Sequence, residues 1–302
     1  MEAFEGKMTW LVVGASGQLG RSVAKVLDER GIDFIELNRD QGSISDQEFV
    51  KKFVSQIQPE VIVNCAAWTD VDGAEVNEES AKLVNADAVG YLAEAARDCD
   101  AIFAHVSTDY VFSGAGNEPW KEDSLKQPLS AYGRTKAAGE DLLFITPGES
   151  SYIFRTAWLY SAYGKNFAKT MVKLALKDSA DVTVVMDQMG QPTFAGDLAN
   201  QLVESIIQRI PFGIYHGTNS GQASWFEFAQ EIFRLVGADV ERIQPVTSEA
   251  FPRPARRPAY SVLGHYKWKD SGVEELRDWK LALADSTPSI LQAVKGEREK
   301  HA

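Results

Sequence analysis

Cysteine, histidine and long apolar runs are scarce in this chain of 302 residues, which contains two cysteines and four histidines. Cys65 and Cys99 cannot build a disulfide framework, and their apolar surroundings predict small buried side chains in a reducing compartment. The apolar run at 10–13 is too short for the core of a signal peptide, and no later run reaches membrane-spanning length. We therefore expect a soluble, cytoplasmic protein with no membrane partner.

Positive charge is also in short supply, with 31 lysines and arginines against 43 acidic residues and a net charge of −12. A phosphate backbone requires a positive field, so nucleic acid is not an expected partner. A small anionic ligand could still bind at the cluster of Arg253, Arg256 and Arg257. This cluster fits a solvated, proline-stiffened loop and a clamp on a diphosphate equally well.

Metal ligands are not grouped in the sequence. His105, His216 and His265 lie far apart without the spacing of a metal site, and packing in the core or on loops accounts for them. The glutamates at 75–79 suit the start of a helix and its dipole. We therefore predict no metal site.

Alternating strands and helices dominate the first half of the chain. This succession predicts an α/β fold, with a Rossmann-like, doubly wound parallel sheet whose six strands are complete by about residue 155. The predicted strands lie at 8–13, 34–37, 61–63, 101–106 and 152–154, with helices at 21–30, 46–57 and 78–98 and around residue 134.

The second half of the chain has a looser pattern. We predict helices at 167–176, 195–208 and 224–236, strands at 182–185 and 213–216, and a disordered tail at 295–302. The resulting division assigns 1–157 to a dinucleotide-binding domain, with 195–235 packing back on it. The segments 158–194 and 236–302 are assigned to a smaller, irregular substrate domain.

A glycine-rich turn joins the first strand to the first helix. Gly14 would permit the tight turn, Gly17 the close approach of a pyrophosphate, and Gly20 close packing of the helix. The spacing Gly-x-x-Gly-x-x-Gly is typical of short-chain dehydrogenases. We expect a dinucleotide at this turn, in contact also with Ser16, Gln18 and Leu19.

The ends of the second and third strands offer further cofactor contacts. Arg39, which follows Asn38, could accept a 2′-phosphate, whereas Asp40 could hold a ribose, so NADPH is favoured and NADH stays open. Small side chains at Ala66 and Ala67 would let a ligand lie against the backbone.

Tyr132 and Lys136 lie four residues apart, on one face of a helix. The lysine ammonium would lower the tyrosine pKa and bind the nicotinamide ribose, while the phenol protonates a carbonyl oxygen that receives hydride at its carbon. Thr108, at the end of a strand, would orient and polarise the same oxygen. Trp158 and Tyr160 could stack on a sugar or base, and core packing is an equally common role for such aromatic residues.

These motifs, together with others along nearly the whole chain, resemble the dTDP-4-dehydrorhamnose reductase family of extended short-chain dehydrogenases. Two stretches, at 69–75 and 187–193, separate this family from other short-chain enzymes. The matching stretches are 14–20, 64–75, 84–85, 107–112, 132–140, 155–158, 166–167, 187–193 and 257–258.

The resemblance implies the site and the chemistry. The family reduces the 4-keto group of dTDP-6-deoxy-L-lyxo-4-hexulose to give dTDP-L-rhamnose, and some members form homodimers around Mg²⁺, whose ligands we do not place in this chain. Ser43 stands before Ile44 where the family usually has an aspartate that contacts adenine. The resemblance assigns Thr108, Tyr132 and Lys136 to catalysis, residues 66–68 with Trp68 to the nicotinamide side, and Thr108, Asp109, Trp158 and Arg257 to the sugar nucleotide.

Two alternatives share these motifs. One is a cofactor-binding regulatory subunit of the methionine adenosyltransferase type, and the other is a nucleotide-sugar epimerase or dehydratase that recycles its cofactor. The arginine cluster favours a diphosphate substrate over the regulatory role. Asp109, beside Thr108, leaves the dehydratase open.

Overall fold

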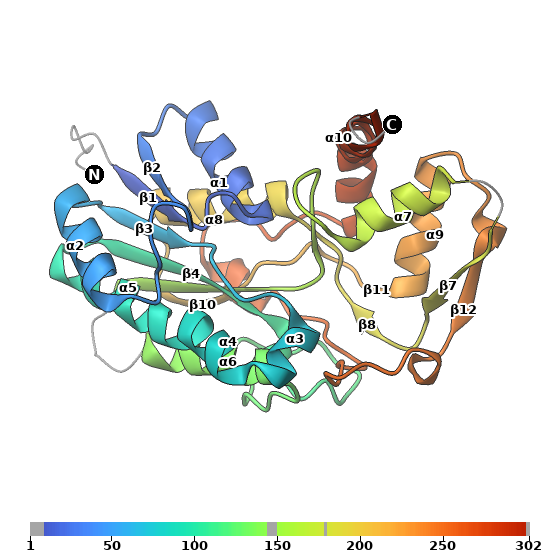
Figure 1. Ribbon diagram of the computed structural model, residues 1–302, viewed down its shortest axis with the longest axis horizontal. Coiled ribbons are helices and arrows are strands. Elements are labelled where there is room, and N and C mark those ends of the chain that lie inside the picture. Colours follow the sequence, from blue (N-terminus) through green and yellow to red (C-terminus); the bar gives the residue numbers. More distant parts are fainter. Residues whose placement is uncertain (1–8, 144–149, 178–179, 300–302) are drawn as a thin grey trace.

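A six-stranded parallel sheet forms the centre of the larger half of the molecule (Figure 1). The computed structural model describes residues 9–143, 150–177 and 180–299. The strand order β10-β5-β4-β3-β1-β2 places β1 and β4 on either side of β3, as expected for a doubly wound sheet. The strands are β1 (Trp10–Val13), β2 (Phe34–Leu37), β3 (Val61–Asn64), β4 (Ile102–Thr108), β5 (Ser151–Thr156) and β10 (Gly213–His216).

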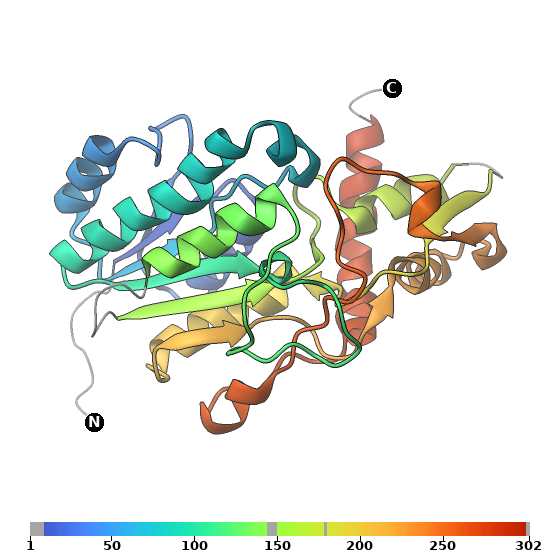
Figure 2. The ribbon, with the colours of Figure 1, turned by 90° about the horizontal axis from the view of Figure 1, so that it is seen from below.

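The central strands are buried on both faces because their side chains alternate between two hydrophobic layers. Trp10 and Val12 pack with α1 and α8, whereas Leu11 and Val13 pack with α2 and α5 on the opposite face. Figures 1 and 2 show these helices covering the two sides of the sheet. The helices of this half are α1 (Gln18–Glu29), α2 (Gln47–Ile57), α3 (Val71–Val76), α4 (Glu78–Lys82), a π-helical turn (Leu83–Asp87), α5 (Ala88–Asp98), α6 (Ala131–Leu142) and α8 (Ala195–Ile207).

The predicted fold class is confirmed, but the expected strand count by residue 155 is wrong. Within the described part of the chain, five strands of the sheet have formed by Thr156, and the sixth is β10, which pairs in parallel with β5. The chain therefore leaves the sheet after β5, crosses into the second half and returns to complete the edge.

The smaller half has a hydrophobic core of its own, built from three helices and short strand pairs (Figure 1). Phe228 and Phe233 of one helix pack with Met171 and Val172 of another and with Leu283 of the C-terminal helix. The elements are β6 (Leu159–Tyr160), α7 (Phe167–Ala175), β7 (Val182–Val185), β8 (Met189–Gly190), β9 (Thr193–Phe194), β11 (Ala223–Ser224), α9 (Trp225–Leu235), β12 (Ile243–Val246) and α10 (Trp279–Glu299).

Two expectations for this region need correction. Helix α8 packs against α1 as expected for 195–235, but α9 packs with α7 and α10 in the second core, because its apolar face matches that core. The expected disordered tail begins too early, since α10 continues to Glu299; residues 300–302 lie outside the described part of the chain. Among the described helices, none combines the length and apolar character needed to cross a membrane.

Candidate active site

The glycine turn is fixed by close backbone contacts. Gly14 has φ +74°, and a Cβ there would lie 2.8 Å from the backbone of Ala66. A Cβ at Gly20 would lie 2.3 Å from the Gly14 carbonyl oxygen, so α1 can pack on the turn only with glycine there. Gly17 is exposed, and within 4 Å a Cβ there would meet only the Gly14 carbonyl oxygen at 3.2 Å among the described residues, so the position is otherwise open to a ligand.

The first turn of α1 presents free backbone donors. The helix begins after Gly17, and no side chain caps it, so its positive end suits a pyrophosphate. The amide of exposed Ser16 donates to Asn38 Oδ1 at 2.7 Å, which ties the end of β2 to the same turn. Arg39 and Ser43 are exposed beyond it, and Ile44 is half-buried against the core.

Gln18 and Leu19, which follow Gly17, have different surroundings. Gln18 Oε1 accepts hydrogen bonds from Ser161 Oγ at 3.1 Å and Asn166 Nδ2 at 2.9 Å, and so links the turn to the second half of the molecule. Leu19 is buried in the core, so only its backbone can face a cofactor. Sequence alone did not indicate the Gln18 contacts, since they span more than 140 positions.

The end of β4 brings the predicted hydroxyl to the edge of the sheet. Thr108 pairs with Thr156 of β5, so Asp109 and Trp158 follow at the same carboxyl edge. Thr108 Oγ1 donates to Asp109 Oδ1 at 2.9 Å. Asp109 Oδ2 is buried without a hydrogen-bond partner among the described residues, and burial raises the pKa of this carboxyl to about 6.

Tyr132 lies in the first turn of α6, which Ser130 caps by accepting from the Gly133 amide at 3.1 Å. The ring meets that of Tyr110 edge-on at 5.5 Å. Burial raises the pKa of Tyr132 to about 12, while interaction with the Thr108 hydroxyl acts in the opposite direction. The structure thus brings Thr108 and Tyr132 together, as the sequence predicted.

Lys136 differs from the expectation that it lowers the pKa of Tyr132. Its Nζ lies 3.0 Å from His105 Nε2 and donates to the Val106 carbonyl oxygen at 2.7 Å. The side chain is 1% exposed, and burial lowers the pKa of its amine to about 8. In this structure the phenol pKa is raised because burial disfavours the phenolate and the charge of Asp109 acts in the same direction.

Several supporting residues escaped the sequence analysis. His105 was assigned to packing, yet it bridges Asn64 and Lys136. Glu75, assigned only a dipole role, accepts from the Ala131 amide at 2.8 Å and so helps to fix the start of α6. A polar residue in a buried strand that ends at a predicted site was the available signal for both Asn64 and His105.

Aromatic side chains lie at two places along this edge of the sheet, after β3 and after β5. Trp68, next to half-buried Ala67, packs in one cluster with Tyr132. Trp158 has φ +46° and stacks on Trp225 with ring centroids 3.6 Å apart. A Cβ at Gly190 would lie 2.4 Å from the Trp158 ring, so glycine there leaves room for this unusual conformation. Tyr160, by contrast, is fully buried in the second core.

In the arginine cluster, Arg257 is bound by a carboxylate, whereas Arg253 and Arg256 are exposed. Arg257 Nη2 donates to Asp72 Oδ2 at 2.9 Å, and Arg253 reaches the same oxygen at 3.9 Å. Arg257 Nη1 is buried without a hydrogen-bond partner in the described part of the chain, so it can serve an anionic ligand.

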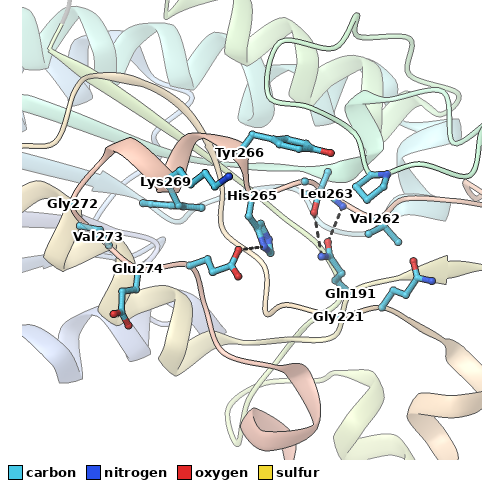
Figure 3. Close-up of a pocket in the computed structure, with 15 residues that line it drawn as sticks. Gln191, Gly221, Val262, Leu263, His265, Tyr266, Lys269, Gly272, Val273 and Glu274 are labelled. Atoms are coloured by element: carbon cyan, nitrogen blue, oxygen red, sulfur yellow. Dashed lines mark hydrogen bonds and ion pairs between the residues drawn. The ribbon is translucent and has the colours of Figure 1, made fainter.

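A pocket of about 990 Å³ is lined largely by the 262–275 segment, and none of the predicted site residues lines it (Figure 3). Gln191 and His265 line it; His265 Nδ1 lies 3.4 Å from Glu275 Oε2. Across residues 9–143, 150–177 and 180–299, we find no group of three or more histidine, cysteine or acidic side chains that could hold a metal ion.

Comparison with known proteins connects this geometry to a family. The sequence model of the family described as RmlD substrate binding domain matches residues 8–291. A dTDP-4-dehydrorhamnose reductase of Streptomyces griseus is 46% identical over 285 residues, which are 93% of each chain. A probable dTDP-4,6-dihydroxy-2-methyloxan-3-one 4-ketoreductase of Streptomyces antibioticus is 44% identical and covers 95% of this chain and 97% of its own.

A solved structure shows the same architecture. The dTDP-4-dehydrorhamnose reductase of Bacillus anthracis, in complex with NADP, is 34% identical and superposes with a TM-score of 0.89, covering 93% of this chain and 99% of its own. With 93% of this chain covered, the match extends over both halves of the molecule. The chain therefore belongs to the dTDP-4-dehydrorhamnose reductase family.

Proposed function

We propose that this protein uses NADPH to reduce the 4-keto group of dTDP-6-deoxy-L-lyxo-4-hexulose to the alcohol of dTDP-L-rhamnose. The observation that carries the proposal is the meeting of Tyr132 with Thr108 at the carboxyl edge of the sheet, the edge at which β1 also ends before the glycine turn. The residues present fit the cofactor: uncapped amides start α1, and Asn38 and exposed Arg39 follow β2. Arg39 favours the 2′-phosphate of NADPH over NADH.

NADPH, when bound, supplies the hydride. Tyr132 gives its proton to the substrate oxygen as negative charge develops there, and Thr108 donates a hydrogen bond to the same oxygen. In this structure the single hydrogen of the Thr108 hydroxyl goes to Asp109 Oδ1 at 2.9 Å, so it must turn from Asp109 to the substrate oxygen when the substrate binds. The Lys136 amine donates to β4 at the Val106 carbonyl oxygen and is proposed to bind the nicotinamide ribose as well. Trp158 and Arg257 are proposed to bind the sugar and the diphosphate.

The test follows NADPH absorbance in the presence of the 4-keto sugar nucleotide and identifies the product by NMR. Tyr132→Phe should lower kcat by about 10²–10⁴-fold, because the phenol proton is lost. Tyr110→Phe is the matched control, since its ring packs edge-on against Tyr132, and it should change kcat by only a few-fold. Equal loss in both variants would argue against Tyr132 as the specific proton donor, whereas no net NADPH oxidation by the unaltered protein would favour the epimerase or regulatory alternatives.

A second candidate is the 4-keto reduction of a different dTDP-deoxysugar. The chain is 44% identical to the Streptomyces antibioticus 4-ketoreductase and 46% identical to the Streptomyces griseus reductase, and this small difference supports the second candidate. Both candidates use the same hydride and proton steps. The proton coupling constants of the product ring separate them, because the two sugars differ in substitution.

We also propose a cytoplasmic setting and a second copy of the chain as partner. Both cysteines are free, which suits a reducing compartment. Light scattering at working concentration measures whether the protein forms a homodimer, and addition of Mg²⁺ in the same measurement tests for a metal-dependent assembly.

A further inference from the structure

A chain of hydrogen bonds runs through the sheet beneath the proposed site. The Ala66 amide donates to Asn64 Oδ1 at 3.0 Å, and Asn64 Nδ2 lies 3.2 Å from His105 Nδ1. His105 Nε2 then lies 3.0 Å from Lys136 Nζ. Asn64 and His105 have no exposed surface, so solvent does not satisfy either group.

The direction of this chain is fixed by the peptide backbone. The Ala66 amide can only donate, so the Asn64 oxygen must face it and the Asn64 NH₂ must face His105. His105 Nδ1 must then be the acceptor, which puts the ring proton on Nε2. That proton points at Lys136 Nζ.

An uncharged amine is the only form of Lys136 that satisfies every bond. Its lone pair accepts from His105 Nε2, one hydrogen goes to the Val106 carbonyl oxygen, and one is left for a ligand. An ammonium at Lys136 would place its N–H donors against the His105 Nε2 proton. If the ring proton moves to Nδ1, it meets the Asn64 NH₂ donor instead. If the Asn64 amide is also flipped, its NH₂ meets the Ala66 amide, which is again a donor. A charged His105 would donate from both ring nitrogens and so would meet the Asn64 NH₂ as a second donor, and burial lowers the pKa of the ring.

We propose that Asn64 and His105 are positioning residues that stabilise Lys136 as an uncharged amine in the cofactor-free protein, so that Lys136 takes up a proton when the cofactor binds. The proton comes from the buffer, converts the amine to an ammonium, and is released with the cofactor. This inference rests on the proposed placement of Lys136 at the nicotinamide ribose.

Other charges around the amine are accounted for. Burial lowers the pKa of Lys136, whereas Glu140 on the same helix and Cys65 after β3 act to raise it. Glu140 is itself bound by Arg155 at 2.9 and 2.7 Å, so its charge is largely engaged. The hydrogen bonds from Ala66 through Asn64 and His105 therefore favour the uncharged amine of Lys136 in addition to the effect of burial.

The first measurement uses the unaltered protein. Calorimetric titration with NADPH at pH 9, in two buffers of different ionisation enthalpy, should show uptake of close to one proton for each cofactor bound. The NADPH Kd should rise toward tenfold for each pH unit above the Lys136 pKa of the free protein. NADPH binding without proton uptake would overturn the inference and leave the reductase proposal standing. If NADPH fails to bind at all, it is the proposed function that fails.

The second measurement follows Lys136 itself in the cofactor-free protein, by NMR of ¹³Cε-labelled lysine assigned through Lys136→Arg. Asn64→Asp should raise the titration midpoint by about one pH unit or more, because a carboxylate accepts from His105 Nδ1 and turns Nε2 into an acceptor. His105→Gln should raise it without adding charge, since its carbonyl oxygen can accept from an ammonium. A midpoint unchanged in His105→Gln would contradict the proposal.

His265→Gln is the matched control, because His265 is also largely buried and bonds to Thr218 at 2.8 Å in the separate pocket. It should leave both the Lys136 midpoint and the proton uptake unchanged. A purely structural role for Asn64 and His105 would lower stability in their variants without moving either quantity.

Discussion

At the scale of single residues, the carboxyl group of Asp109 combines burial with incomplete hydrogen bonding. Its pKa is raised to about 6 by burial, so the folded state holds a proton more tightly than the unfolded chain does. Folding stability from this group is therefore present at low pH and is lost as the pH rises from about 4 through about 6.

Replacement of Asp109 by asparagine should consequently stabilise the protein at pH 7.5 by about 1–3 kcal/mol, because the cost of the buried charge disappears. The gain should shrink at pH 5, and urea unfolding at both pH values measures it. Asp123→Asn, at an exposed carboxylate, is the control and should have little effect at either pH. A destabilised Asp109→Asn protein at pH 7.5 would show that the charge is better solvated than the structure indicates.

The residues of the site were predictable where chemistry and position coincide in the sequence. Thr108 follows an apolar strand and Tyr132 opens a helix after a capping serine, so sequence placed both at the same edge. The bond between Lys136 and His105 was not predictable, because it depends on how α6 lies across β4. Spacing alone places Lys136 on the face of Tyr132 and does not say which way its amine points.

At the scale of elements, the turn between β1 and α1 separates two roles of glycine. Gly20→Ala should destabilise the protein by about 1–3 kcal/mol, because its Cβ would lie 2.3 Å from a backbone oxygen. Gly17→Ala should change stability by less than about 1 kcal/mol, yet weaken NADPH binding at least tenfold. Chemical unfolding and fluorescence titration measure the two effects. NADPH affinity that is unaltered in Gly17→Ala would remove the cofactor from this turn.

The same scale shows where sequence patterns stop being informative. The succession of strands and helices up to β5 follows from visible apolar periodicity. Residues 213–216 also form the predicted short strand, but the sequence of four residues does not indicate which sheet the strand belongs to or which strand it pairs with. Helix α9 was misplaced for a similar reason, since an apolar face predicts burial and does not identify the partner.

At the scale of the whole molecule, the 253–258 segment returns to the cofactor half, where Asp72 of α3 holds Arg257 at 2.9 Å. Arg257→Met should raise the KM for the dTDP-sugar at least tenfold and leave the NADPH Kd unchanged, because a guanidinium pairs strongly with a diphosphate. Arg256→Met, at an exposed neighbour, is the matched control and should alter neither value. Equal effects of the two variants would argue against a specific role for Arg257.

The late return of β10 to the sheet has a consequence for synthesis on the ribosome. Until residue 216 has emerged, the nascent chain carries β5 with one row of backbone donors and acceptors unpaired, although every residue of that strand is buried in the finished protein. A truncated product ending near residue 157 would keep β5 as an unpaired edge strand and would tend to aggregate. The glycine turn and Tyr132 are thus translated early, but the sheet that supports them is complete only after β10 has been synthesised and has paired with β5.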